Sequence, residues 1–93
     1  MAKRIWKYPL TTNGVVKRIT GKLSKILTID VQNEQPYCWI LIDDDVEEIS
    51  IDLVGIGTGW EIPEEVENMG FVGTLQTGEY VWHYFWKLVD NET

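Results

Sequence analysis

A chain of 93 residues with a formal net charge of −7 predicts one domain, residues 1–93, with room for a single small core. The acidic total disfavours binding to a long nucleic acid, whose affinity comes from many phosphate contacts. One cysteine excludes an internal disulfide, and with one histidine it cannot supply the ligands of a structural zinc site, so we expect no metal and no cofactor.

The chain contains no apolar stretch long enough to span a bilayer. Its N-terminus is basic, but no apolar run of signal-peptide length follows it. We therefore expect a protein that stays inside the cell and makes no membrane contact, with Cys38 as a buried, unreactive thiol.

Acidic and basic residues occupy different parts of the sequence. Seven of the eight basic residues fall in the first 25 positions, where no acid occurs, and all 15 acidic residues come from Asp30 onward. Such a basic cluster can hold a small phosphorylated anion. The alternative is that these residues balance acidic loops within the fold or across a subunit boundary. The seven are Lys3, Arg4, Lys7, Lys17, Arg18, Lys22 and Lys25.

The first half of the chain predicts four strands. A strand at residues 4–10 leads to a turn at 11–14, where Asn-Gly suits the positive φ angles of a type I′ hairpin. A short strand at 15–20 follows, and apolar and polar residues then alternate from 25 to 31. After a turn at 33–36, residues 37–42 are apolar on both faces, which is typical of a central buried strand paired with its predecessor.

The second half adds three strands and at most one short helix. The acidic link at 43–48 lacks the glycine and final glutamate of an EF-hand, which favours a solvated turn over a calcium loop. Residues 49–53 form a strand that continues toward Trp60, and residues 61–70 predict either one or two helical turns or a loop. A short strand at 71–75 precedes the last strand, and residues 90–93 should fray. The whole pattern predicts a mainly β fold, a small antiparallel sandwich or barrel of six to seven short strands.

The last predicted strand, residues 80–86, is almost entirely aromatic. One face carries Tyr80, Trp82, Tyr84 and Trp86, and the other carries Val81, His83 and Phe85. A half-exposed strand would alternate apolar with polar residues, and this one does not. We therefore expect one face to lie on the core and the other on a subunit or a ligand.

Three glycines alternate along Gly55-Ile56-Gly57-Thr58-Gly59. Their spacing matches neither a dinucleotide-binding fingerprint nor a Walker loop. Glycine lets the backbone approach another group closely, whereas the plainer interpretation is a bulge at the end of a strand.

The sequence favours binding over catalysis. His83 has no serine or cysteine near it in sequence, so a hydrogen-bonded histidine in a packed layer is the favoured interpretation, and the carboxylates lie in solvated loops. Exposed rings stack on nucleobases, and adjacent basic residues neutralise phosphate. The residues that we predict to bind a ligand are Arg4, Trp6, Lys7, Tyr8, Gly57, Thr58, Gly59, Trp60 and His83.

The motifs at residues 5–10, 57–59 and 81–85, with the hairpin around residues 25–39, resemble a family of small phage and bacterial proteins, a domain of unknown function. Its members read Ile-Trp-Lys-Phe-Pro-Leu near the start and Val-Trp-His-Val-Phe near the end. This chain has Tyr8 in place of the usual Phe and continues past Phe85. The resemblance implies phage or prophage origin and offers no catalytic residues.

Several unrelated small phage proteins sequester nucleotides made by bacterial immune systems, and by analogy with them we expect a sponge of this kind, acting without catalysis in the host cytoplasm. Its partners would be a small nucleotide and further copies of the chain in a homo-oligomer. The alternative is an accessory protein whose aromatic strand docks on a host or virion protein, and enzymatic cleavage of a nucleotide ranks third.

Overall fold

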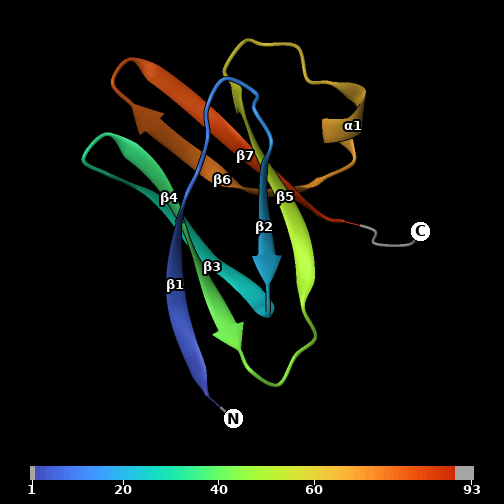
Figure 1. Ribbon diagram of the computed structural model, residues 1–93. Helices are drawn as coiled ribbons and strands as arrows, with labels where there is room; N and C mark the ends of the chain where they lie inside the picture. The colour runs from blue at the N-terminus through green and yellow to red at the C-terminus, as the bar shows by residue number, and fades with distance from the viewer. Residues whose placement is uncertain (1, 90–93) are drawn as a thin grey trace.

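The strand pattern of the sequence folds into seven β-strands in two antiparallel sheets, with one short helix (Figure 1). This computed structural model describes residues 2–89, so the fraying expected at 90–93 lies outside the described residues. The elements in chain order are β1 (Lys3–Pro9), β2 (Lys17–Gly21), β3 (Leu23–Gln32), β4 (Gln35–Asp43), β5 (Ile49–Gly57), α1 (Glu64–Glu67), β6 (Gly70–Thr77) and β7 (Tyr80–Leu88).

The two sheets make a sandwich, and the chain passes repeatedly from one sheet to the other. The first sheet has the order β1-β4-β3 and the second has the order β2-β5-β7-β6. The sheets approach each other where β3 packs beside β6 and the Ile29 side chain lies against Gly73. This architecture confirms the predicted mainly β fold with at most one short helix.

The Asn-Gly turn has the predicted backbone but a different role. Asn13 and Gly14 have φ angles of 63° and 74°. They do not close a hairpin, because β1 and β2 belong to different sheets. Instead the turn carries the chain across one end of the sandwich, where the Gly14 amide donates to the Gly55 carbonyl over 3.0 Å (Figure 1).

The strand buried on both faces is β5, whereas the sequence predicted β4. In β4 the inward side chains of Cys38 and Ile40 are buried, but Trp39 on the outer face is only half-buried. Every residue of β5 from 50 to 57 is buried. The reason is that Val66 of α1, which realises the predicted helical turn, covers Val54 and Ile56 on the outer face of β5.

The aromatic strand β7 has one face in the core, as predicted. Trp82 and Tyr84 are buried between the sheets. On the opposite face Phe85 is half-buried and packs beside the cluster that Val66 completes. The second contact of this strand is therefore provided in part by the α1 segment of the same chain.

Two titratable groups lie deep in the core. Burial raises the pKa of the Cys38 thiol to about 11, as expected for an unreactive cysteine. Burial likewise raises the pKa of Tyr84 to about 12, and its hydroxyl donates to the Thr11 carbonyl over 2.8 Å.

Gly55 and Gly57 make room for aromatic rings. A Cβ at Gly55 would lie 2.7 Å from Cε1 of Tyr84, and one at Gly57 would lie 2.8 Å from Cε2 of Trp60. The β5–β7 register runs without a shift through both positions, so the structure has close ring approach there and no bulge. Of the three alternating glycines 55, 57 and 59, only Gly59, with φ of +89°, needs glycine for its backbone conformation.

Arg18 and Asp52 join the short strand β2 to β5. They are direct cross-strand partners, and Nε and Nη2 of Arg18 donate to the two carboxylate oxygens over 2.8 and 3.0 Å. Asp52 is only 5% exposed. The hydrogen bonds from Arg18 hold the pKa of Asp52 below its ordinary value, with a smaller contribution from the charge of Lys87.

Gly55→Ala should destabilise the fold by about 1–3 kcal/mol, because the new methyl group overlaps the buried Tyr84 ring. Gly21→Ala is the matched control, since its Cβ would meet only Leu23 Cδ2 at 3.4 Å, an ordinary contact. The control should change the free energy of unfolding by less than about 1 kcal/mol. Urea unfolding measures the free energy of unfolding of both variants. Equal losses of stability in the two variants would contradict the interpretation that Gly55 makes room for the Tyr84 ring.

Asp52→Asn should weaken the fold at neutral pH and make its stability less sensitive to acid. Because the folded-state pKa of Asp52 is lowered, its contribution is present above the unfolded-state value, near 3.8, and is lost as pH falls through the folded-state value. The stability difference between wild type and variant should therefore shrink below that pH. Urea unfolding measured from neutral to acidic pH tests this, with the exposed Glu79→Gln as control.

Candidate ligand-binding site

An open pocket of about 890 Å³ lies at the end of the sandwich where the chain crosses between the sheets. We call it the end pocket. It is built by the crossing segment 10–15, Glu34 of the β3–β4 turn, the first two residues of β4, Trp60 and the start of β7, with Thr77 at the end of β6. Residues distant in sequence thus form one concave surface.

Three aromatic rings form one side of the end pocket. Trp82 is 4% exposed, and its Nε1 donates to Thr77 Oγ1 over 2.9 Å. Trp60 meets Trp82 edge to face, with ring centroids 5.3 Å apart, and Tyr80 stacks on Trp82 at 5.9 Å. Trp60 is 46% exposed and Tyr80 is 67% exposed, so two rings offer surface to a ligand while the third anchors them.

Local sequence explains why Trp60 projects here. The Trp60 amide donates to the Gly57 carbonyl over 3.1 Å in the turn after β5. The indole then folds back over Gly57, where any side chain would displace it. The glycine pattern singled out in the sequence therefore positions a candidate ligand-binding ring.

The polar lining of the end pocket is mostly uncharged. The Gln35 side-chain amide donates to the carbonyls of Leu10 and Pro36 over 2.9 and 2.8 Å, which joins the β3–β4 turn to the crossing segment. Glu34 is the one charged residue of the lining. The pocket therefore favours a planar neutral or cationic group over an anionic one.

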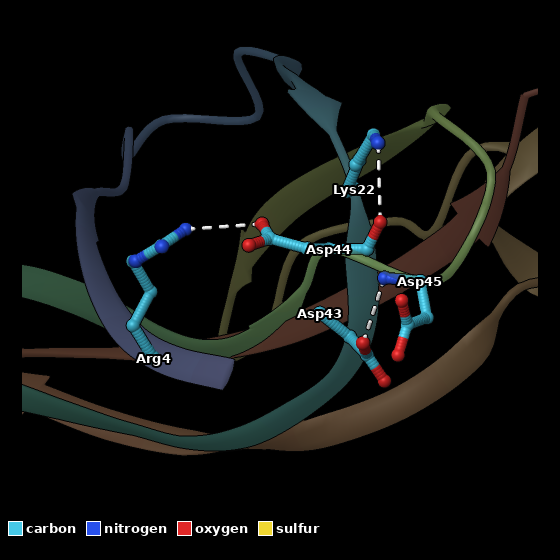
Figure 2. A network of polar contacts seen from close by, with 5 residues as sticks. All are labelled: Arg4, Lys22, Asp43, Asp44 and Asp45. Carbon is cyan, nitrogen blue, oxygen red and sulfur yellow. Dashed lines mark hydrogen bonds and ion pairs between the residues drawn. The ribbon is translucent and has the colours of Figure 1, made fainter. Parts of the chain in front are cut away.

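The basic residues predicted for the site are engaged elsewhere. Arg4 Nη1 forms an ion pair with Asp44 Oδ1 at 3.2 Å, next to a Lys22 ammonium that donates to the Asp44 carbonyl (Figure 2). The predicted acidic turn is thus held by residues of the basic segment, and the Asp45 amide closes it by donating to Asp43 Oδ1 over 2.9 Å (Figure 2).

The four predicted residues of β1 point to two faces of the first sheet. Tyr8 and Trp6 are the cross-strand partners of the buried β4 residues Cys38 and Ile40, so their side chains point inward, as does that of Arg4. Trp6 is nevertheless 53% exposed, since β1 is an edge strand. Lys7 points outward, where its ammonium donates to Gln32 Oε1 over 3.0 Å and lies 4.4 Å from the centre of the Tyr37 ring. None of these four lines the end pocket.

His83 lies on the outer face of the second sheet. Its Nε2 is 2.7 Å from Thr58 Oγ1 and its Nδ1 is 3.0 Å from Thr74 Oγ1. This is the hydrogen-bonded histidine that the sequence favoured. Of the predicted residues, the structure brings together Thr58 with His83, and Gly57 with Trp60, while Gly59 occupies the turn between these pairs.

Sequence reasoning missed Tyr80 and the polar residues of the crossing segment as parts of a site. The sequence places Tyr80 on the same face of the aromatic strand as Trp82 and Tyr84 and does not single it out for binding, yet it is the first residue of β7 after the turn at Gly78, where φ is +58°. Side chains at the end of a buried strand face are expected to be more exposed than those in its middle. The end position of Tyr80 could therefore have indicated that its ring is available to a ligand.

Within residues 2–89, no group of three or more His, Cys, Asp or Glu side chains is placed to hold a metal ion. Among the helices of the described part, none is long and apolar enough to cross a membrane.

Comparison with known proteins gives a family without an assigned activity. The model of the family described as domain of unknown function (DUF7352) matches residues 1–93. The chain belongs to this family. No curated protein and no solved structure matches the chain. The resemblance to a family of unknown function is thus confirmed, and the site's function has to be argued from its geometry.

Trp82→Ala should cost about 3–5 kcal/mol of unfolding free energy, because it empties a large buried site. Trp60→Ala should cost about 0.5–1.5 kcal/mol, since the ring is half-exposed and mainly loses its pairing with Trp82. Urea unfolding distinguishes the two rings. A loss for Trp60→Ala as large as that for Trp82→Ala would show that Trp60 is a core residue and contradict its assignment to the site.

Proposed function

We propose that this protein binds a small molecule with a planar ring in the end pocket and acts by sequestering it, without catalysis. The supporting observation is the pair of exposed rings, Trp60 and Tyr80, held on either side of the buried Trp82. A nucleobase is a planar group that stacks on such rings, and each base–aromatic stack contributes about 1–3 kcal/mol.

In its specific form, the proposal is a phage-encoded sponge that removes a bacterial immune signalling nucleotide in the host cytoplasm. Support for the phage origin comes from the family resemblance, and support for the nucleotide comes from the exposed rings. Because Glu34 is the charged residue of the pocket, the base would lie inside and the phosphates would point to solvent. A nucleoside should therefore bind about as well as its nucleotide.

Small β proteins often complete their burial by self-association, and we propose a homo-oligomer for this chain. Support comes from the large apolar side chains exposed on the described surface, among them Phe71 at 60% and Leu88 at 59%. The same exposure supports the second candidate function, docking of β7 on a host or virion protein.

A thermal-shift panel of nucleosides, cyclic nucleotides and ADP-ribose derivatives tests the proposed function. One member should raise the melting temperature of the wild-type protein, because a ligand that binds only the folded state stabilises it. Trp60→Ala and Tyr80→Ala should each lower the affinity by about fivefold to more than a hundredfold. The matched controls Trp6→Ala and Lys7→Ala, outside the pocket, should leave it unchanged.

The released ligand and the interaction partners decide among the alternatives. Heating the complex should release the ligand intact, whereas altered ligand would indicate an enzyme. The docking function would be favoured over the sponge by two results together. No member of the panel would shift the melting temperature, and a discrete host protein would be recovered only when Tyr80 and Trp86 are intact.

A further inference from the structure

Strand β1 forms an open edge of the sandwich. It lies at the end of the order β1-β4-β3 and pairs only with β4 among the described strands (Figure 1). Six of its seven residues are exposed, and Tyr8 is half-buried. The backbone amides and carbonyls on the outer side of an edge strand have no ladder partner. β1 therefore offers a row of backbone hydrogen-bonding groups to a further strand.

The other three sheet edges are less suited to strand addition. Strands β3 and β6 lie side by side, and their pairings with β4 and β7 contain two register shifts and one register shift. Such irregularities disrupt the backbone ladder that an added strand requires. Strand β2 is five residues long and ends at Gly21. By contrast, β1 pairs with β4 without a shift from Lys3 to Pro9, so its backbone is regular over the whole strand.

The side chains of β1 present apolar surface in the middle of this edge. Lys3, Ile5 and Lys7 share the outer face of the sheet, whereas Trp6 points to the inner face. Ile5 is 59% exposed and Trp6 is 53% exposed. Side chains of neighbouring strands contact each other on each face of a sheet. An added strand would therefore bury these two side chains with apolar residues of its own.

The charges of β1 indicate which kind of strand can be added. The strand contains three cations and no acid. Arg4 is paired with Asp44, but in the described part of the chain no carboxylate lies within ion-pair distance of Lys3 or Lys7, and Lys7 donates to the neutral Gln32. Cations on an edge strand discourage pairing with a second copy, which carries the same charges. The same cations attract a strand that carries carboxylates.

We propose that β1 binds an acidic, extended peptide segment of another protein by strand addition. Its carboxylates lie beside Lys3 and Lys7, and its apolar side chains lie beside Ile5 and Trp6. The peptide therefore has two acids four positions apart, as the two lysines are, with apolar residues between them. This interaction is independent of ligand binding in the end pocket, because no residue of β1 lines that pocket.

The probe is the fluorescein-labelled peptide Thr-Glu-Val-Val-Val-Glu-Thr with an amidated C-terminus. Its side-chain pattern is the same in both chain directions, so it fits parallel and antiparallel addition alike. Fluorescence anisotropy should show saturable binding of one peptide per protein chain. The matched peptide Thr-Lys-Val-Val-Val-Lys-Thr should not bind. Absence of saturable binding by the acidic peptide, or equal binding of the two peptides, would overturn the proposal.

N-methylated peptides distinguish backbone pairing from simple charge attraction. Alternate residues of an added strand direct their amides toward its partner. The even-numbered residues of the acidic peptide are methylated in one version, and its inner odd-numbered residues in the other. One version should bind at least about tenfold more weakly, and the other should still bind. Hydrogen exchange followed by NMR should show that the peptide protects alternate amides of β1. Equal binding of the two versions would overturn the proposal.

Protein variants locate the peptide on β1. Lys7→Glu should weaken binding at least about threefold, because an attractive contact becomes repulsive. Lys25→Glu makes the same change of charge at the opposite edge of the same sheet, on β3, and should weaken binding less than about twofold. Equal weakening by the two variants would contradict binding at β1.

Two further measurements separate this edge from the end pocket and from a dimer interface. Trp60→Ala should retain peptide binding whatever it does to the end pocket, so this proposal and the proposed function can fail separately. Loss of peptide binding in Trp60→Ala would place the peptide in the end pocket. A dimer whose alternate β1 amides are protected without peptide would show that a second copy covers the edge. Either result overturns the proposal.

Discussion

The contact between the Tyr84 ring and Gly55 is the constraint on which the rest of the molecule depends. The ring occupies space that even a methyl group at position 55 would take, so the absence of a side chain there lets the ring lie against β5 and reach the crossing segment. The Tyr84 hydroxyl donates to Thr11, and the Gly55 carbonyl accepts from Gly14. Both residues of this contact therefore also hold the crossing segment that links the two sheets.

Burial falls off along β7 on both sides of this contact, and each loss of burial coincides with a cavity. Toward the start of the strand, Trp82 is still buried but Tyr80 is 67% exposed at the end pocket. Toward the end of the strand, Trp86 and Leu88 are exposed beside a mainly apolar cavity between the sheets. One strand thus supplies the centre of the core and part of the lining of both cavities, which accounts for its unusual run of aromatic residues.

The fold could be predicted from the sequence because its signals are local. Alternation of apolar and polar residues, an Asn-Gly turn and a proline before a short acidic helix each depend on neighbouring positions. The burial of β5 could not be read in this way, because Asp52 is covered through its pairing with Arg18, and Val54 through α1. Those contacts span segments that only the folded chain brings together.

The candidate site was harder to predict for a related reason. The alternating glycines allowed either close approach or the plainer interpretation of a bulge, and the sequence does not specify that the Trp60 ring folds back over Gly57. The basic N-terminal segment suggested phosphate binding because seven of the eight basic residues fall in the first 25 positions. Alternation along a strand sends Lys7 and Arg4 to opposite faces, and Asp44 meets Arg4 at the end of the neighbouring strand.

The chemistry of the lining distinguishes the two cavities more clearly than their shape does. Both are open and of similar volume, and both include aromatic side chains. The end pocket has Glu34 and the hydrogen-bonding side chain of Gln35 in its lining, whereas the cavity between the sheets reaches the buried apolar side chains of Ile40 and Ile51. Both linings include side chains of β7, so the two cavities differ in polarity although the same strand contributes to each.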